Sequence, residues 1–152
     1  MALKVGDTLP SVEVKDENDA VVKLGPSHMT GPMVLYFYPK DDTPGCTKEA
    51  CSFRDSYASF TDAGVTVYGV SGDSPKSHRK FIEKYRLPFS LLSDKGNTLR
   101  KAIGVPTNLL GLIPGRVTYI IDKHGKIVHI FNSQTQAEKH VAEALQVIET
   151  LG

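Results

Sequence analysis

The strongest constraint on the fold is a pattern that occurs twice: a continuous apolar run followed directly by the start of a helix. "PMVLYFYP" (residues 32–39) is rich in β-forming residues, and "DDTPGC" follows with Thr43 as helix cap and Pro44 in the first turn. "VTVYGVS" (65–71) is followed by a similar serine and proline. Continuous apolar strands are typical of sheets covered on both faces, and proline suits the first helical position. The pattern predicts an α/β fold.

The remaining elements extend this order on both sides. Alternating residues in 11–15 and 21–24 flank turn residues and predict an N-terminal β-hairpin, and 116–122 and 126–131 predict a second antiparallel hairpin. Between them we expect a short strand over 89–94 and a helix around residues 99–103. The chain is therefore predicted to be one domain, residues 1–152, with a central mixed β-sheet flanked by helices.

Three helices carry apolar residues at helical spacing. The first is predicted to run from Thr43 to the residue before Gly64, and the last to open at Thr135. The apolar positions are Phe53, Tyr57 and Phe60 in the first helix, Phe81, Ile82 and Tyr85 in the second, and Ala137, Val141, Ala144, Leu145, Ile148 and Leu151 in the last.

Charge and hydropathy argue against two classes of partner. The net charge is +1, with 18 basic and 17 acidic residues mixed along the chain, so no basic stripe favours nucleic acid. The longest apolar run, 33–38, is far too short for a membrane span. The first ten residues lack the features of a secretory signal or a transit peptide. We expect a cytoplasmic protein, or a plastid protein whose transit peptide has been removed.

Two cysteines are too few for a disulfide scaffold in a chain of this length, which favours a reducing compartment and a catalytic pair. A zinc site is not expected, because zinc ligands normally come as closely spaced pairs and a second pair is missing. The histidines are scattered and are predicted to be surface or hairpin residues: His28, His78, His124, His129 and His140.

Cys46 is predicted to lie in the first turn of its helix, where free backbone N–H groups and the positive end of the helix dipole favour a thiolate. Gly45 beside it removes side-chain bulk. Asp41 and Asp42 oppose a thiolate electrostatically, so we expect a cation from elsewhere in the fold. Cys51 is open to two readings, a small buried hydrophobe or the chemical partner of Cys46.

The spacing of the two cysteines is informative. Residues five apart on an ideal helix differ by roughly 7.5 Å of rise and about 140° of rotation, which separates their Cα atoms by about 8.6 Å. A disulfide needs Cα atoms within about 7 Å. Cys46 and Cys51 therefore cannot bridge while the helix is intact, and a disulfide between them would be a conformational event.

The segment "PKDDTPGC" resembles the peroxiredoxin active-site pattern P-x-x-x-T-x-x-C, at Pro39, Thr43 and Cys46. The longer "FYPKDDTPGCTKEAC" is similar to the Q-type, or bacterioferritin-comigratory, branch. "VSGDSPKSHRKF", "LPFSLLSD" and "PGRVTYIID" follow in the order of that branch, so the resemblance covers nearly the whole chain. It implies a thioredoxin-like fold.

The resemblance also implies an activity. An enzyme of this kind is an atypical 2-Cys peroxidase that reduces hydrogen peroxide and alkyl hydroperoxides, in antioxidant defence and redox homeostasis. Cys46 would be the peroxidatic nucleophile and Cys51 the resolving cysteine, joined in an intramolecular disulfide that thioredoxin or a related dithiol reduces. No cofactor or metal is implied, and this branch is often monomeric.

Roles for the surrounding residues follow from the same resemblance. Arg116 is expected against the reactive sulfur, although from the sequence alone it reads as a solvated residue at a strand start. Thr43, Gly45 and Arg116 are expected to contact the peroxide, and Pro39 to shield the thiolate. Glu49 matches a position that supports the arginine, but an ordinary acid in the first turn would also suit the helix dipole.

Three other functions share part of this pattern. A thiol–disulfide oxidoreductase normally carries C-x-x-C, whereas this chain has C-x-x-x-x-C. A glutathione-peroxidase-like enzyme would need a tryptophan partner, and the chain has no tryptophan. A non-enzymatic redox sensor, switched by oxidation of Cys46, would use the same residues. Catalytic turnover of peroxide separates an enzyme from a sensor.

Overall fold

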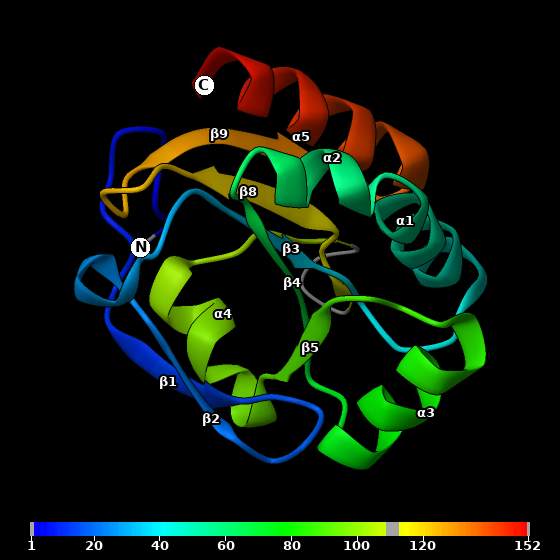
Figure 1. Ribbon diagram of the computed structural model, residues 1–152. Helices are drawn as coiled ribbons and strands as arrows, with labels where there is room; N and C mark the ends of the chain where they lie inside the picture. The colour runs from blue at the N-terminus through cyan, green and yellow to red at the C-terminus, as the bar shows by residue number, and fades with distance from the viewer. Residues whose placement is uncertain (1, 109–112, 152) are drawn as a thin grey trace.

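A seven-stranded mixed sheet forms the centre of the computed structural model, which describes residues 2–108 and 113–151 (Figure 1). The strand order is β2-β1-β5-β4-β3-β8-β9. The strands are β1 (Val12–Lys15), β2 (Val21–Leu24), β3 (Met33–Phe37), β4 (Thr66–Ser71), β5 (Ser90–Ser93), β8 (Val117–Ile121) and β9 (Ile127–Asn132). β3, β4 and β5 pair in parallel, while β8, β9 and the hairpin β1–β2 pair antiparallel. The predicted mixed sheet and N-terminal hairpin are confirmed.

Both faces of the sheet are covered, because alternate residues of β3 enter different hydrophobic clusters. Val34 and Tyr36 pack in the cluster that includes α1, α2, α3 and α5. Leu35 and Phe37 pack on the other face, in the cluster that includes α4 and the hairpin. The helices are α1 (Pro44–Asp55), α2 (Tyr57–Asp62), α3 (Pro75–Tyr85), α4 (Thr98–Ile103) and α5 (Ala137–Leu151). One sheet with a cluster on each face supports the proposal that residues 1–152 form one domain.

The first predicted helix is wrong in one respect, because it is not continuous to Gly64. Ser56, with φ −103° and ψ 7°, separates α1 from α2. Serine readily bonds to nearby backbone groups in place of the helical pattern, so it is a weak position in a long helix. The break lets α2 turn so that Phe60 packs on Phe53, with ring centroids 5.7 Å apart. The apolar stripe therefore stays buried across two short helices.

Smaller elements were not predicted. The two-stranded sheet β6 (Thr107–Asn108) and β7 (Ile113–Pro114) is too short to show a periodicity. Two 3₁₀ turns also occur, η1 (Pro26–His28) and η2 (Lys95–Asn97). The last helix begins at Ala137, two residues after the predicted start. Within the described residues, none of the helices combines the length and apolarity needed to cross a membrane.

Candidate active site

Cys46 lies in the first turn of α1, two residues after the first helical residue Pro44. It is a free thiol and is 1% exposed. The position matches the prediction, but Thr43 does not cap the helix with its side chain. Its hydroxyl instead donates to the backbone carbonyl of Lys40, 2.9 Å away. Thr43 thus stabilises the loop before the helix and leaves the N–H groups of the first turn uncapped by its oxygen.

Arg116 lies directly before β8, and its side chain reaches the sulfur of Cys46. Nη2 donates to Sγ at 3.4 Å, although the two residues are 70 positions apart in the chain. Nη1 donates to Oε1 of Glu49 at 2.7 Å, and Nε donates to the backbone carbonyl of Gln134 at 3.1 Å. The residue is buried, so the reading of a solvated residue at a strand start is wrong. Contacts from all three guanidinium nitrogens fix the direction of Nη2.

Gly45 makes this approach possible. A Cβ atom at Gly45 would lie 2.8 Å from Nη2 of Arg116, closer than real Cβ contacts come. Because the guanidinium is held on its other side by Glu49, the missing side chain leaves the space that Nη2 occupies. Glycine at this position is therefore a packing requirement of the Arg116–Cys46 contact.

Glu49 faces inward from α1 and is fully buried. Burial raises its pKa to about 8, although the adjacent Arg116 acts in the opposite direction. For Arg116, burial lowers the pKa, but the charges of Glu49 and Cys46 outweigh this and leave the pKa above its ordinary value. The geometry favours the supporting position for Glu49 over that of an ordinary acid on the helix surface.

His140 of α5 lies behind Glu49, and its prediction as a surface or hairpin residue is wrong. Its ring is fully buried, with Nε2 2.7 Å from the carbonyl of Ser133 and Nδ1 2.8 Å from Oγ1 of Thr118. Nδ1 is 3.6 Å from Oε2 of Glu49. Burial lowers the pKa of His140 to about 4, and the positive charge of Arg116 adds to this. A neutral ring thus closes the site behind Glu49.

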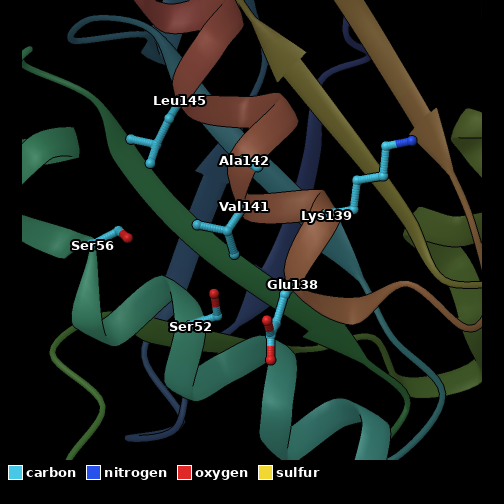
Figure 2. A pocket seen from close by; sticks show the side chains of 7 residues that line it. All are labelled: Ser52, Ser56, Glu138, Lys139, Val141, Ala142 and Leu145. Atoms are coloured by element: carbon cyan, nitrogen blue, oxygen red, sulfur yellow. The ribbon is translucent and has the colours of Figure 1, made fainter.

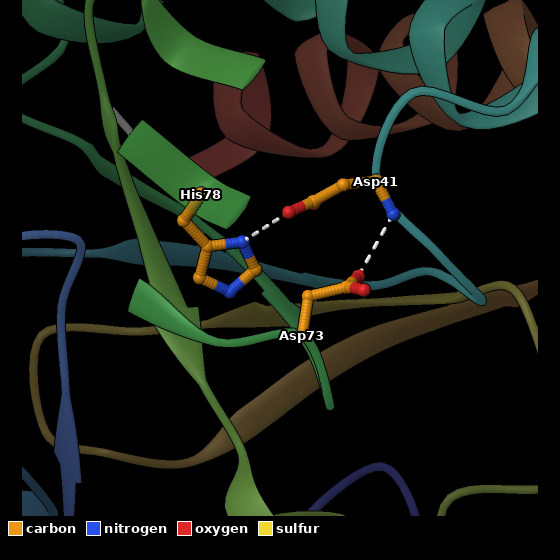
Figure 3. A group of neighbouring side chains, drawn as sticks. All are labelled: Asp41, Asp73 and His78. Carbon is orange, nitrogen blue, oxygen red and sulfur yellow. Dashed lines mark hydrogen bonds and ion pairs between the residues drawn. The ribbon is translucent and has the colours of Figure 1, made fainter. Parts of the chain in front are cut away.

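Asp41 and Asp42, which were expected to oppose a thiolate, are each bound to other groups. Asp42 accepts from Nζ of Lys84 and from the hydroxyl of Tyr85, both at 2.7 Å. Asp41 lies 2.7 Å from Nδ1 of His78, which is fully buried, so the surface prediction is wrong for His78 as well (Figure 3). The charge of Asp42 is therefore compensated by Lys84, and the carboxylate of Asp41 is engaged by hydrogen bonds from Tyr38 and Ser77.

Asp41, Asp73 and His78 lie close enough together to share a metal ion, since one ligand atom from each falls within 4.8 Å of the others. The atoms are engaged otherwise. Oδ2 of Asp41 accepts from Ser77 in addition to its contact with His78, and Oδ2 of Asp73 accepts from the backbone N–H of Asp41 (Figure 3). A metal at this position would have to displace these hydrogen bonds, so the cluster does not suit one.

Cys51 is a half-buried free thiol on the outer part of α1. It borders a pocket of about 370 Å³ together with Lys48, Ser52 and Glu138. A neighbouring pocket lies between α1 and α5, where Ser52 points toward the space that Val141 enters from α5 (Figure 2). Open space therefore borders Cys51, while Cys46 is enclosed. Pro39, the remaining predicted site residue, is half-buried in the loop between β3 and α1.

Comparison with known proteins agrees with this geometry. The model of the AhpC/TSA family matches residues 5–130. A peroxiredoxin Q, chloroplastic, from Triticum aestivum is 52% identical over 147 residues, which cover 96% of this chain and 67% of the relative.

Solved structures show the same fold. The peroxidoxin BcpB of Mycobacterium tuberculosis superposes with a TM-score of 0.89 at 35% identity, covering 99% of each chain. A Xanthomonas campestris bacterioferritin comigratory protein, studied for alkyl peroxide reduction, superposes with a TM-score of 0.79 at 30% identity, covering 93% of this chain and 98% of the other. The predicted thioredoxin-like architecture is confirmed by these neighbours.

Proposed function

The chain belongs to the AhpC/TSA family, and from this premise we propose that it is a thiol-dependent peroxidase that reduces hydrogen peroxide and alkyl hydroperoxides through Cys46. The observation that carries the proposal is the contact of Arg116 Nη2 with Sγ, 3.4 Å long, at the first turn of α1. A buried guanidinium and a helix start both favour a thiolate at this position.

The proposed reaction transfers one electron pair from the sulfur to the peroxide. The thiolate attacks the distal oxygen of the hydroperoxide, an S–O bond forms and the O–O bond breaks. The products are a sulfenic acid on Cys46 and an alkoxide or hydroxide, which takes up a proton and leaves as alcohol or water. Sulfur is oxidised and the peroxide is reduced, so neither a metal nor an organic cofactor is required for the step.

Stabilisation of the transition state contributes more to this rate than ionisation of the thiol can. A free cysteine is about 3% thiolate at pH 7, so complete ionisation raises the rate by roughly 30-fold at most. Lower basicity also makes the thiolate less nucleophilic. Donors directed at the oxygens are each worth about 3 kcal/mol in comparable sites. Arg116 and the N–H groups of Gly45 and Cys46 are the proposed donors, and the hydroxyl of Thr43 joins them when it turns from the carbonyl of Lys40 to the peroxide.

The supporting residues have separate roles in this proposal. Glu49 holds Nη1 of Arg116 at 2.7 Å and so directs Nη2 at the sulfur. Gly45 leaves room for Nη2. Pro39 shields the thiolate from water and restricts the loop that presents Thr43.

Cys51 is proposed to resolve the sulfenic acid. Its thiol condenses with Cys46, releasing water and forming an intramolecular disulfide. The two residues belong to one intact helix, so α1 must unwind between them first. A dithiol protein, thioredoxin or a relative, then reduces the disulfide to two thiols.

We propose further that the protein acts as a monomer and, like the relatives named chloroplastic, in a plastid. Fractionation of the source cells tests the plastid location against the cytoplasmic alternative. Size-exclusion chromatography at several concentrations tests the monomer.

Two substitutions test the proposed function. Cys46→Ser should abolish peroxide consumption. Cys51→Ser should leave the first turnover intact and let the sulfenic acid accumulate, where a nucleophilic trap detects it. Equal loss of the first turnover in both variants would contradict the assigned roles.

The redox-sensor alternative is separated by turnover. With thioredoxin and its reductase present, the proposed enzyme consumes many equivalents of peroxide per protein. A sensor consumes one equivalent and stops.

A further inference from the structure

The loop between β3 and α1 is bound to the start of α3 by a group of residues that the peroxidase mechanism does not use. Asp41 of this loop accepts hydrogen bonds from the hydroxyl of Tyr38 at 2.5 Å and from Ser77 at 2.8 Å, and lies 2.7 Å from His78. Its backbone N–H donates to Asp73 at 2.8 Å (Figure 3). We refer to these five residues as the Asp41 anchor.

His78 is the central member of this anchor because both of its ring nitrogens face acceptors. Nδ1 lies 2.7 Å from Oδ2 of Asp41, and Nε2 lies 3.0 Å from the backbone carbonyl of Leu92. A carbonyl oxygen and a carboxylate oxygen can only accept, so both contacts are hydrogen bonds when both ring nitrogens carry hydrogen. In that form the ring joins Asp41 to β5 and compensates its negative charge.

The anchored loop carries the residues that begin the active site. Asp41 lies between Pro39 and Thr43, and the hydroxyl of Thr43 bonds back to Lys40 within the same loop. The backbone of Asp42 adopts the left-handed conformation, with φ 56°, which few non-glycine residues occupy. A loop with such a strained residue keeps its shape only when its surroundings hold it, and the Asp41 anchor supplies that support.

The Asp41 anchor is separate from the support of the sulfur. Arg116 reaches Cys46 from β8 and is held by Glu49 and Gln134, none of which belongs to the anchor. Among the described residues, the side-chain hydrogen bonds of the anchor join the loop after β3 to β4, the loop that follows β4, α3 and β5. Unwinding of α1 after Pro44 therefore breaks none of these hydrogen bonds.

We propose that His78 is a positioning residue for peroxide reduction: through Asp41 it holds the loop that presents Pro39 and Thr43 to the peroxide. This inference rests on the proposed peroxidase function. The first step, attack on the peroxide, needs the loop in place, because a misplacement of about 1 Å in an active site can lower a rate by roughly a hundredfold. Disulfide formation needs α1 to unwind and does not need the anchor.

Two substitutions of His78 separate its two contacts. The amide nitrogen of asparagine in His78→Asn can occupy the place of Nδ1 and donate to Asp41. The amide nitrogen of glutamine in His78→Gln reaches the place of Nε2 and donates to Leu92. Each variant keeps one of the two hydrogen bonds, so a purely structural role of His78 predicts similar first-step rates in the two variants. A positioning role through Asp41 predicts that His78→Gln is much the more damaging.

The experiment measures the two steps separately in the full-length chain. Stopped-flow mixing with hydrogen peroxide in the Cys51→Ser background gives the first step. Thiol titration against time in the Cys51-containing protein gives disulfide formation, at a peroxide concentration high enough that the first step is complete beforehand in every variant. We expect His78→Gln to slow the first step by about tenfold or more and His78→Asn to slow it less. Disulfide formation from the sulfenic acid should keep its wild-type rate in both.

Two further variants complete the test. Ser77→Ala removes one donor to Asp41 and leaves His78 in place, so it tests the Asp41 anchor even if the His78 variants do not fold, and it should slow the first step. His129→Asn is the control: its amide nitrogen takes the place of Nδ1, so it loses the partly buried contact of Nε2 with Glu143, 2.9 Å long, and should leave the first step unchanged.

The outcomes distinguish the two proposals. If the wild-type protein consumes no peroxide, the proposed function fails and this inference with it. If the wild-type protein is active, equal first-step rates in His78→Asn and His78→Gln overturn the inference alone. So does a wild-type first step in Ser77→Ala, or a parallel slowing of disulfide formation in His78→Gln.

Discussion

Replacement of Gly45 by alanine tests the contact on which the proposed chemistry depends. The new Cβ would lie 2.8 Å from Nη2 of Arg116. An unstrained contact between such atoms is about 3.5 Å or longer, so the guanidinium must retreat by roughly 0.7 Å. Since Nη2 now donates to Sγ at 3.4 Å, the distance would grow to about 4 Å, too long for a useful hydrogen bond.

The expected effect on activity follows from this displacement. Loss of one donor to the transition state typically lowers a rate by about 10²- to 10³-fold. Because Arg116 is displaced and not removed, we expect Gly45→Ala to lower the first-step rate constant by about 10- to 100-fold. The effect on stability should be small, because the preference of a helix for alanine over glycine, up to about 1 kcal/mol, offsets part of the overpacking cost of about 1–3 kcal/mol.

The assay is stopped-flow peroxide consumption over a range of pH, together with thermal unfolding. Gly72→Ala is the matched control, because a Cβ at Gly72 would meet its nearest neighbour, Oδ1 of Asn97, at an ordinary 3.6 Å. A Gly45→Ala rate within about twofold of wild type would refute the reasoning. So would a slow variant whose rate recovers fully at high pH, since Arg116 would then act only by ionising Cys46.

Two further predictions use other parts of the site. Arg116→Ala should lower the first-step rate by about 10²- to 10³-fold even at a pH where Cys46 is fully ionised; a rate restored by raising pH would contradict a role in the transition state. For His140, the pKa is about 4 in the folded protein and near 6.5 unfolded, so the unfolded state binds more protons between these values. The contribution of this ring to the free energy of unfolding should therefore fall by about 3 kcal/mol as pH decreases from 6.5 to 4, while Glu49, whose pKa is raised to about 8, acts in the opposite direction. Denaturant titrations should show that the stability of wild type relative to His140→Gln decreases over that window, and a constant difference would contradict the assignment.

The fold was predictable because its signals are local. The run 32–39, the similar run 65–71 and the Pro44 start each specify an element within a few residues, and their order implies the mixed sheet. The break at Ser56 was not predictable in the same way. It depends on the packing of Phe60 against Phe53, which the spacing of apolar residues along one helix does not reveal.

The site was predictable in part for the same reason. The position of Cys46 in a first turn follows from its neighbours, whereas its contact with Arg116, 70 residues away, is fixed only by the fold. The two histidines carried a signal that the interpretation missed. His78 lies three residues before Phe81, and His140 lies three after Ala137 and four before Ala144, within the apolar stripes of their helices. A polar residue in such a stripe indicates burial with a hydrogen-bonding partner.

The proposed chemistry also explains how α1 can serve two steps: attack on the peroxide needs its first turn intact, and disulfide formation needs it unwound. The thiolate of Cys46 stabilises the first turn of α1 through its hydrogen bond from Arg116 and its position near the positive end of the helix dipole. A hydrogen bond to a charged group is worth about 1.5–3 kcal/mol and the dipole about 0.3–1 kcal/mol.

Oxidation to the neutral sulfenic acid removes most of both contributions, so it favours the unwound helix by roughly 2–4 kcal/mol, or about 30- to 1,000-fold in population. The Asp41 anchor and the stacking of Phe53 on Tyr36, 4.5 Å between ring centroids, hold the chain on either side of the segment that unwinds. The motion is then confined to the residues between them, which include Cys46 and Cys51. Oxidation of Cys46 therefore destabilises the helix turn that attack on the peroxide needed, which prepares α1 for disulfide formation.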